Sequence, residues 1–392
     1  MADRRGFNIA TEEEIRSGRV TDVYFQRALA ALRTRQVDKV VVGEVRVRHL
    51  PESWPWGVLV GVQEVARLLQ GLPIKAWAPP EGSLFRPGEP VLTIERQTKA
   101  FGLLETAFLG MLCQASGIAT KSARCRIAAG ERTLLSFGAR RMHPALAPMI
   151  ERACYVGGCN GVSTLLAADL IGIPPTGTMP HALVLILGDT LEAAWAFDES
   201  VDPDVKRIVL IDTFADEKFE TLRVAEAMGD KLFGVRFDTP GSRPGDLAEI
   251  MAETRWELDL RGYRQVKLFA SGGLDEHRIP ELNPVCDGYG VGTSLSNAPT
   301  VNFSFDIVEI EGEPIAKRGK RSGGKFIALC PECGQRQLLS WRESPGRCAC
   351  GAERRWLNEP LVQGGKLIAK MRDATEIRAW VLDQQSELTK GG

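Results

Sequence analysis

The sequence predicts an α/β protein made of an irregular α/β barrel, an α+β sandwich domain and a small C-terminal cysteine module. Between residues 116 and 300, short apolar runs, polar tips and helical segments repeat roughly every 20 to 35 residues, which is typical of βα units with parallel strands. Segments of alternating apolar and polar residues precede this region, as in a half-buried sheet. Four of the nine cysteines cluster near the C-terminus.

Composition excludes several classes of protein. The 392 residues are 44% hydrophobic and 25% charged, and the net charge of -1 gives no reason to expect a nucleic-acid partner. No uninterrupted apolar stretch reaches the roughly 18 residues of a membrane helix, and the polar start MADRRGFNIATEEE does not resemble a signal peptide. We therefore expect a cytoplasmic protein without a membrane partner. The remaining cysteines are scattered through apolar segments, as a reducing compartment allows.

The N-terminal domain is predicted to span residues 1–115 as an α+β sandwich. Residues 11–33 read as two helices with a Thr cap and a break at Ser17-Gly18, and residues 39–48 read as a half-buried strand. A helix at 59–72 and three short strands at 75–96 follow. The apolar helix 102–114 is expected to end at the Ser-Gly-Ile-Ala-Thr stretch 116–120, and strands in 301–324 are expected to complete the domain.

The barrel is predicted over residues 116–300, with its best strands after residue 200 and two or three weak strands before it. In such folds the carboxyl ends of the strands carry the ligand site. The predicted polar tips are Phe137 to His143, Asp212, Arg236 with Asp238, Ser271-Gly272-Gly273 and Gly292-Thr293.

The stretch after Phe137 predicts a site for a flat anion. Arg140 is suited to bidentate contact with a carboxylate or phosphate, and Phe137 is suited to stacking on a planar ring. Arg141 and His143 lie in the same junction. The alternative is a solvated loop whose arginines form surface ion pairs.

Glycines at two successive strand ends predict a phosphate site. Gly272, Gly273 and Gly292 leave backbone amides open to a phosphate, and the last strands of a barrel are its usual place. The alternative is two tight turns. Asp212 and Asp238 could hold Mg²⁺, bind ribose hydroxyls or face a developing cation, whereas a structural pair of Arg236 with Asp238 is the plain alternative.

The C-terminal module, residues 325–392, contains two cysteine pairs. Cys330 and Cys333 form one knuckle, and Cys348 and Cys350 form a CxC knuckle where CxxC is commoner. Four thiolates in two pairs predict a closed structural zinc site and leave no open position for catalysis. The alternative is four unligated cysteines. His181 follows a Gly/Pro turn, where a single histidine is more often structural.

Eight stretches together resemble nicotinate phosphoribosyltransferase, a type II phosphoribosyltransferase, in its smaller form that ends in a zinc-binding knuckle module. The resemblance covers nearly the whole chain and implies a dimer, or a larger homo-oligomer, whose active sites combine residues of both subunits. The stretches are TDVYF, SGIAT, SFGARRMHP, GTMPHAL, IDTF, VRFDTPGSRPGD, ASGGLDE and GVGTSLSN.

The resemblance also implies residue roles. Phe137 and Tyr24, the latter from the partner subunit, would sandwich the pyridine ring, with Arg140, Arg236 and Asn160 near its carboxylate. Asn160 argues for nicotinate because nicotinamide-using relatives tend to place an Asp there. The other implied roles are Arg141 and His143 at the phosphates of phosphoribosyl pyrophosphate, Ser271, Gly272, Gly273, Gly292 and Thr293 at the 5'-phosphate, and Asp212 and Asp238 at ribose and Mg²⁺.

The implied reaction transfers phosphoribosyl from phosphoribosyl pyrophosphate to nicotinate, giving nicotinate mononucleotide for NAD synthesis. His181 matches the histidine that relatives phosphorylate from ATP, although Ala182 stands where many of them have Glu, which leaves ATP coupling open. Nicotinamide or quinolinate are the rival substrates. From other classes, a zinc-ribbon binding protein on an inactive barrel and an unrelated phosphate-binding barrel such as an aldolase stay open, although no Schiff-base lysine stands at a clear strand tip.

Overall fold

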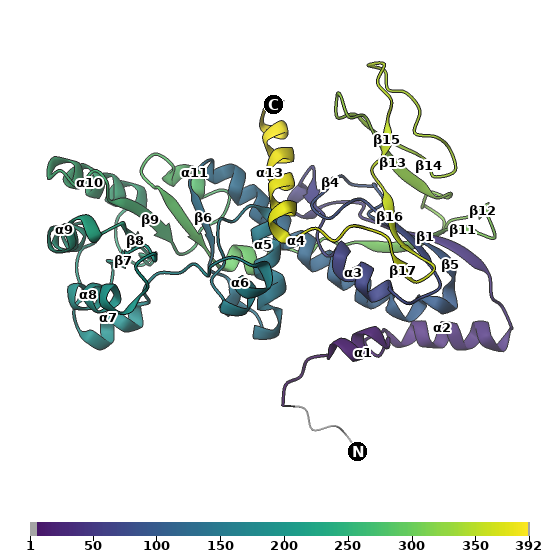
Figure 1. Cartoon of the computed structure of the whole chain (residues 1–392), viewed down its shortest axis with the longest axis horizontal. Coiled ribbons are helices and arrows are strands. Elements are labelled where there is room, and N and C mark those ends of the chain that lie inside the picture. The colour runs from purple at the N-terminus through teal and green to yellow at the C-terminus, as the bar shows by residue number, and fades with distance from the viewer. Residues whose placement is uncertain (1–5, 391–392) are drawn as a thin grey trace. The chain divides into compact units, whose positions relative to one another are not determined.

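The computed structural model describes residues 6–390 and contains two compact units (Figure 1). The first unit comprises the residues up to Thr120 together with Pro299–Gln384, and the second comprises Lys121–Ala298 together with Gln385 onward. The cysteine knuckles therefore belong to the first unit. The three-part division expected from the sequence stays a prediction.

The first unit is built on a seven-stranded antiparallel sheet with the order β12-β11-β1-β5-β3-β16-β17. Its helices are α1 (Glu12–Arg16), α2 (Val23–Thr34), α3 (Val62–Leu69), the part of α4 (Glu105–Ala129) up to Thr120, and the part of α13 (Ala374–Lys390) up to Gln384. Its strands are β1 (Val40–Arg46), β2 (Gly57–Val58), β3 (Lys75–Ala78), β4 (Leu84–Phe85), β5 (Leu92–Gln97), β11 (Ser304–Ile310), β12 (Glu313–Pro314), β13 (Lys325–Leu329), β14 (Arg336–Ser340), β15 (Arg355–Trp356), β16 (Glu359–Gln363) and β17 (Lys366–Leu367).

Local sequence explains these elements. Thr11 caps α1 in a capping box, because its hydroxyl accepts from Glu14 N at 3.2 Å while Thr11 N donates to the Glu14 carboxylate at 3.0 Å. In β1 the register against β5 places Val45 opposite Leu92. Both side chains are buried in a core shared with α3. Strand β11 pairs with β1, so the segment after residue 300 adds a strand to the sheet of this unit.

Helix α4 corrects one prediction. It does not end at 116–120 but continues through that stretch to Ala129. The Ser116 hydroxyl accepts from Val60 N at 3.1 Å, and the Thr120 hydroxyl accepts from Val58 N at 2.9 Å. The small polar residues therefore tie the helix to strand β2 and do not stop it. Gly117 serves close packing, since a Cβ there would lie 2.3 Å from Pro299 O.

By length and composition, the helical stretch Gly102–Ala129 is the one described segment that could cross a membrane, but half of its most apolar window is buried. Core helices of soluble proteins have the same character. Polar and charged residues interrupt the apolar ones, so no unbroken run of that length occurs; among them are Glu105, Gln114, Ser116, Thr120 and Lys121.

The second unit is built on five parallel strands with the order β6-β10-β9-β8-β7. The strands are β6 (Thr133–Ser136), β7 (Ile208–Leu210), β8 (Gly234–Phe237), β9 (Lys267–Ser271) and β10 (Gly288–Val291). The helices are α5 (Ala147–Gly157), α6 (Leu165–Ile171), α7 (His181–Leu187), α8 (Thr190–Ser200), α9 (Glu217–Met228), α10 (Leu247–Leu260), α11 (Ile279–Leu282) and α12 (Thr293–Ser296). Helices α7, α8, α9 and α10 lie next to one another in chain order, each in contact with the next (Figure 1).

The barrel is irregular, as predicted, and within the described residues no strand pairing closes it between β6 and β7. Of the two or three weak strands expected before residue 200, the described chain contains only β6 and a single parallel bridge between Leu135 and Gly161. Thr164 ends that bridge segment by starting α6, and three prolines follow between residues 174 and 180. Because proline cannot donate to a strand ladder, this segment crosses the gap without forming a strand.

Candidate active site

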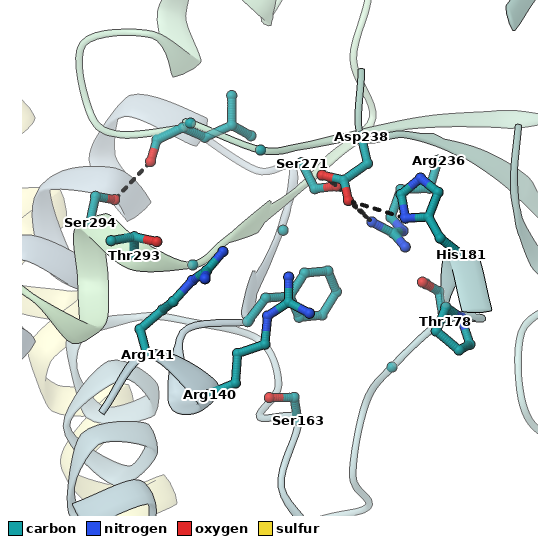
Figure 2. Close-up of a pocket in the computed structure, with 18 of the residues that line it drawn as sticks. Arg140, Arg141, Ser163, Thr178, His181, Arg236, Asp238, Ser271, Thr293 and Ser294 are labelled. Carbon is teal, nitrogen blue, oxygen red and sulfur yellow. Dashed lines mark hydrogen bonds and ion pairs between the residues drawn. The ribbon is translucent and has the colours of Figure 1, made fainter. Parts of the chain in front are cut away.

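A cavity of about 930 Å³ opens at the carboxyl ends of the parallel strands in the second unit (Figure 2). Its walls come from the segments that follow β6, β9 and β10, from the end of β8 and from the start of α7. The predicted residues that line it are Phe137, Arg140, Arg141, His181, Arg236, Asp238, Ser271, Gly272, Gly273, Gly292 and Thr293.

The turn after β6 presents an aromatic ring and two cations. Phe137 packs over Gly290, where any Cβ would lie 2.2 Å from the ring, so β10 must carry glycine there. Arg140 and Arg141 lie in the following 3-10 turn and both project into the cavity (Figure 2). In the described chain no carboxylate pairs with either guanidinium. Two cations without an anionic partner make this wall a site for anions.

The end of β8 forms a polar network. Arg236 Nη1 lies 3.2 Å from Asp238 Oδ2 and donates to Ser271 Oγ at 2.8 Å, and Ser271 Oγ donates to Asp238 Oδ1 at 2.9 Å. Arg236 is buried, and burial lowers its pKa while the charges of Asp238 and Asp212 raise it. The alternation predicted for Arg236 and Asp238 therefore brings both side chains to one side of the sheet.

His181, at the start of α7, lies between two carboxylates. Its Nε2 is 3.3 Å from Asp212 Oδ1, and its Nδ1 is 3.9 Å from Asp238 Oδ2. Asp212 is buried, with 2% of its side chain exposed, and neither of its oxygens has a well-directed hydrogen-bond donor in the described chain. Burial raises the pKa of Asp212, and His181 opposes that effect. A buried carboxylate with unused acceptors suits a cation or a hydroxyl-bearing ligand.

The glycines after β9 and β10 leave backbone exposed to the cavity. Gly272 and Gly273 have φ of +87° and +64°, which favour glycine, and the space above the Gly273 Cα is open. Ser294 donates to Leu274 O at 2.7 Å, so the two loops are joined. Open backbone beside two joined loops is the arrangement that binds phosphate.

Comparisons with known proteins agree on one family. The N- and C-terminal domains of quinolinate phosphoribosyl transferase match residues 22–116 and 118–306. Nicotinate phosphoribosyltransferase pncB1 of Mycobacterium tuberculosis is 32% identical over 362 residues, covering 80% of this chain and 78% of that protein. The chain belongs to the nicotinate phosphoribosyltransferase family. Among the curated relatives, pncB2 of the same organism is 37% identical over 262 residues, and the match spans 64% of this chain but only 54% of pncB2.

Solved structures show the same fold. A nicotinate-nucleotide pyrophosphorylase from Pyrococcus furiosus matches with a TM-score of 0.96 at 49% identity, covering 98% of this chain and 99% of that one. Human nicotinic acid phosphoribosyltransferase matches with a TM-score of 0.74 at 20% identity, covering 92% of this chain and 93% of that one, and this likeness concerns the fold alone.

Four residues predicted for the site of this family member do not line the cavity. His143 Nδ1 accepts from Ala145 N at 3.2 Å and so caps the turn that precedes α5. Asn160 Oδ1 accepts from Arg126 Nη1 at 2.8 Å and from Leu134 N at 2.9 Å, which gives it a task in holding β6. Asp212 lies behind His181, which contacts it and lines the cavity. Tyr24 is exposed on α2 of the first unit.

Sequence reasoning missed several cavity residues, above all Ser163 and Thr178. Both lie in the segment that crosses the open side of the barrel, where no strand pattern marks a polar tip. The available signal was the pair Ser163-Thr164 shortly after Gly161, since a polar pair after a strand-like end is a common loop anchor.

The four predicted zinc ligands of this chain come together in its first unit. Their sulfur atoms lie within 4.8 Å of one another, with Cys330 to Cys350 at 3.5 Å and Cys333 to Cys348 at 3.6 Å. Tetrahedral zinc with bonds of about 2.3 Å separates its sulfurs by about 3.8 Å, so the set fits that ion. Gly334 and Gly351, with φ of +68° and +91°, follow the second cysteine of each pair and close the knuckles.

The four thiols also influence one another's ionisation. A backbone hydrogen bond involving Cys350 is the main factor that lowers the pKa of Cys348, to about 6. At Cys333 a backbone hydrogen bond involving Gln335 lowers the pKa, but the neighbouring thiols outweigh it and the pKa rises to about 12. Because four thiolates this close together would repel one another, they would need a positive ion beside them.

Proposed function

We propose that the chain is a nicotinate phosphoribosyltransferase. It transfers the phosphoribosyl group of phosphoribosyl pyrophosphate to the ring nitrogen of nicotinate and releases nicotinate mononucleotide and pyrophosphate, in NAD biosynthesis. The observation that carries the proposal is that one cavity contains two features. The guanidiniums of Arg140 and Arg141, which have no carboxylate partner in the described chain, lie beside Phe137, and the open glycine loops follow β9 and β10. The full-length likeness to a nicotinate-nucleotide pyrophosphorylase supports the same product.

Each wall of the cavity has a task in this reaction. Phe137 would stack on the pyridine ring while Arg140 holds the carboxylate, with Arg236 behind it. Arg141 would neutralise the pyrophosphate, and the amides of Gly272, Gly273, Gly292 and Thr293 would cradle the 5'-phosphate. Tyr24 of a second subunit would cover the other ring face.

The chemical step needs placement and charge, not a covalent nucleophile. The lone pair of the ring nitrogen forms the bond to C1 of the sugar as the bond from C1 to the pyrophosphate oxygen breaks, and that electron pair leaves with pyrophosphate. Positive charge develops on the sugar, so Asp238 would stabilise it, and fixing the ring gives in-line attack. Asp238 lines the cavity, and Asp212, behind His181, keeps both oxygens without a well-directed donor, so these carboxylates would hold Mg²⁺, which would neutralise charge on the leaving group.

Three further parts of the proposal rest on separate observations. Zinc would hold the four-cysteine cluster as a structural ion. His181 would take phosphate from ATP, since the cavity exposes its ring while both nitrogens face carboxylates. Exposed leucines and an isoleucine on α6 and α7 suit a homodimer interface in a cytoplasmic enzyme, namely Leu165, Leu166, Leu170, Leu185, Ile186 and Leu187.

The reaction is tested by pyrophosphate release from the purified protein with phosphoribosyl pyrophosphate and Mg²⁺. Nicotinate, nicotinamide and quinolinate are offered separately, each with and without ATP. We expect turnover with nicotinate only, stimulated by ATP. Turnover only with another ring would contradict the proposed substrate, and salt-dependent nucleic-acid binding without turnover would favour a zinc-ribbon binding protein.

The two neighbouring arginines provide a sharper test. Arg140→Ala should raise the KM for nicotinate by about 10- to 100-fold, the worth of a charged hydrogen bond, with little change in the KM for phosphoribosyl pyrophosphate. Arg141→Ala, the matched variant, should show the reverse pattern. Normal KM values for nicotinate in Arg140→Ala, with the far-UV circular dichroism unchanged, would refute the assignment.

A further inference from the structure

Ser271, the last residue of β9, has a buried hydroxyl to which the proposed reaction gives no part. Its Oγ accepts from Arg236 Nη1 at 2.8 Å and donates to Asp238 Oδ1 at 2.9 Å. The other carboxylate oxygen, Asp238 Oδ2, lies 3.2 Å from Arg236 Nη1 and 3.9 Å from His181 Nδ1. The hydroxyl is therefore bonded to both partners of an ion pair in the cavity wall (Figure 2).

These bonds decide what Ser271 can offer to a ligand. A serine hydroxyl has one hydrogen and two lone pairs. The hydrogen goes to the Asp238 carboxylate, because the other acceptor within reach, Phe237 O, is farther away at 3.3 Å and uncharged. Ser271 can therefore donate to a phosphate oxygen only by giving up its bond to Asp238.

The same bonds fix the plane of the Asp238 carboxylate. The terminal torsion of an aspartate is broad, so its own rotamer preference does not set that plane. An arginine favours a carboxylate that it can hold through both oxygens. Because Ser271 takes Oδ1 and also accepts one hydrogen of Arg236 Nη1, it opposes closure of the pair onto both oxygens.

We propose that Ser271 is a positioning residue for Asp238. By bonding to Oδ1 it keeps the carboxylate from turning into a two-oxygen contact with Arg236, and so keeps its charge directed at the cavity, where positive charge develops on the sugar. Gly272 leaves room for this position, since a Cβ there would lie 3.0 Å from Asp238 Oδ1. The inference rests on the proposed function, because it assumes that the sugar reacts beside Asp238.

Ser271→Ala tests the role by removing both hydrogen bonds at little cost in volume. We expect kcat with nicotinate to fall about 10- to 100-fold, as a misplaced catalytic group does, and the KM for phosphoribosyl pyrophosphate to change less than about threefold. A raised KM for phosphoribosyl pyrophosphate with kcat unchanged would show a phosphate ligand and overturn the inference. Ser136→Ala is the matched control, since Ser136 is buried at the end of β6 and does not line the cavity.

The decisive comparison is a double-mutant cycle with Asp238→Asn, whose amide no longer carries the charge that Ser271 positions. If Ser271 acts through Asp238, adding Ser271→Ala to Asp238→Asn should lower kcat by less than about threefold further. Effects of the two substitutions that multiply would show that Ser271 acts independently of Asp238, and would overturn the inference.

Crystal structures of the unliganded wild type and Ser271→Ala give a readout that needs no turnover. We expect both oxygens of Asp238 to lie within hydrogen-bond distance of the Arg236 guanidinium in the variant, and an unmoved carboxylate overturns the inference. Absence of wild-type turnover with nicotinate contradicts the proposed function itself. Normal wild-type turnover, together with Ser271→Ala behaving like Ser136→Ala, contradicts only the role of Ser271.

Discussion

At the scale of single residues, the buried carboxylate of Asp212 is expected to lower the stability of the unliganded protein at neutral pH. Its carboxylate is buried, its oxygens lack well-directed donors, and burial raises its pKa against the opposing effect of His181. An acid whose pKa is raised on folding favours the folded state only below its unfolded pKa of about 3.9, and that advantage is lost as the pH rises through the folded pKa. At neutral pH the ionised group therefore costs stability.

Asp212→Asn should consequently stabilise the unliganded protein at pH 7 by about 1 kcal/mol, or about 2–4 °C in Tm, while turnover is lost. The difference from wild type should grow from pH 4 upward and level off above the folded pKa of Asp212. Asp238→Asn is the control: Asp238 already pairs with Arg236 and Ser271, so its loss should not stabilise. Thermal unfolding between pH 4 and 8 measures both, and a less stable Asp212→Asn at pH 7 would contradict this account.

At the scale of elements, α4 contains two glycines at which substitution by alanine should have opposite effects on stability. Gly117 faces Pro299, and a Cβ there would lie 2.3 Å from the carbonyl oxygen, whereas Gly110 in the same helix has nothing within 4 Å of its Cβ position. Alanine has the better helix propensity at both positions by about 1 kcal/mol. The contact with Pro299 decides the sign at Gly117.

Gly117→Ala should therefore destabilise the protein by about 1–3 kcal/mol, because the backbone of α4 and the segment at Pro299 must separate. Gly110→Ala should be neutral or stabilise by up to about 1 kcal/mol. Urea unfolding of the two variants beside wild type gives both values. If both substitutions shifted the midpoint in the same direction, the close approach at Gly117 would not be the cause.

The same helix marks what the sequence could and could not predict. Periodicity identified α3, β1 and the strands β7 to β10, because each buries one face or both faces within a short segment. It could not foresee that Ser116 and Thr120 continue α4, since their hydrogen bonds to Val60 and Val58 join residues far apart in the chain. The residue pattern after the predicted strand at 133–137 pointed to Phe137 and Arg140, which line the cavity, whereas Ser163 is held by Glu151 through hydrogen bonds that no local pattern reveals.

At the scale of the whole molecule, the cysteine module is bound into the first unit and is not an appendage. Arg336, at the start of β14, donates to Leu84 O at 2.8 Å and pairs with Glu89 at 3.2 Å. Asn358, which follows β15, donates to Pro90 O at 3.2 Å and accepts from Ile327 N at 2.8 Å. Loss of order in the knuckles should therefore loosen contacts to β4 and to the segment before β5.

Zinc removal should accordingly destabilise the first unit and leave the chemistry of the cavity intact. We expect one zinc per chain by elemental analysis, and Cys348→Ser should lose it and lower the first unfolding transition by roughly 5 °C or more. Cys113→Ser is the matched control because Cys113 lies outside the cluster in the same unit. Below that transition, the KM values for both substrates should stay near wild type, since a closed four-cysteine site has no position for substrate. A metal-free wild-type protein of equal stability would refute the structural role of zinc.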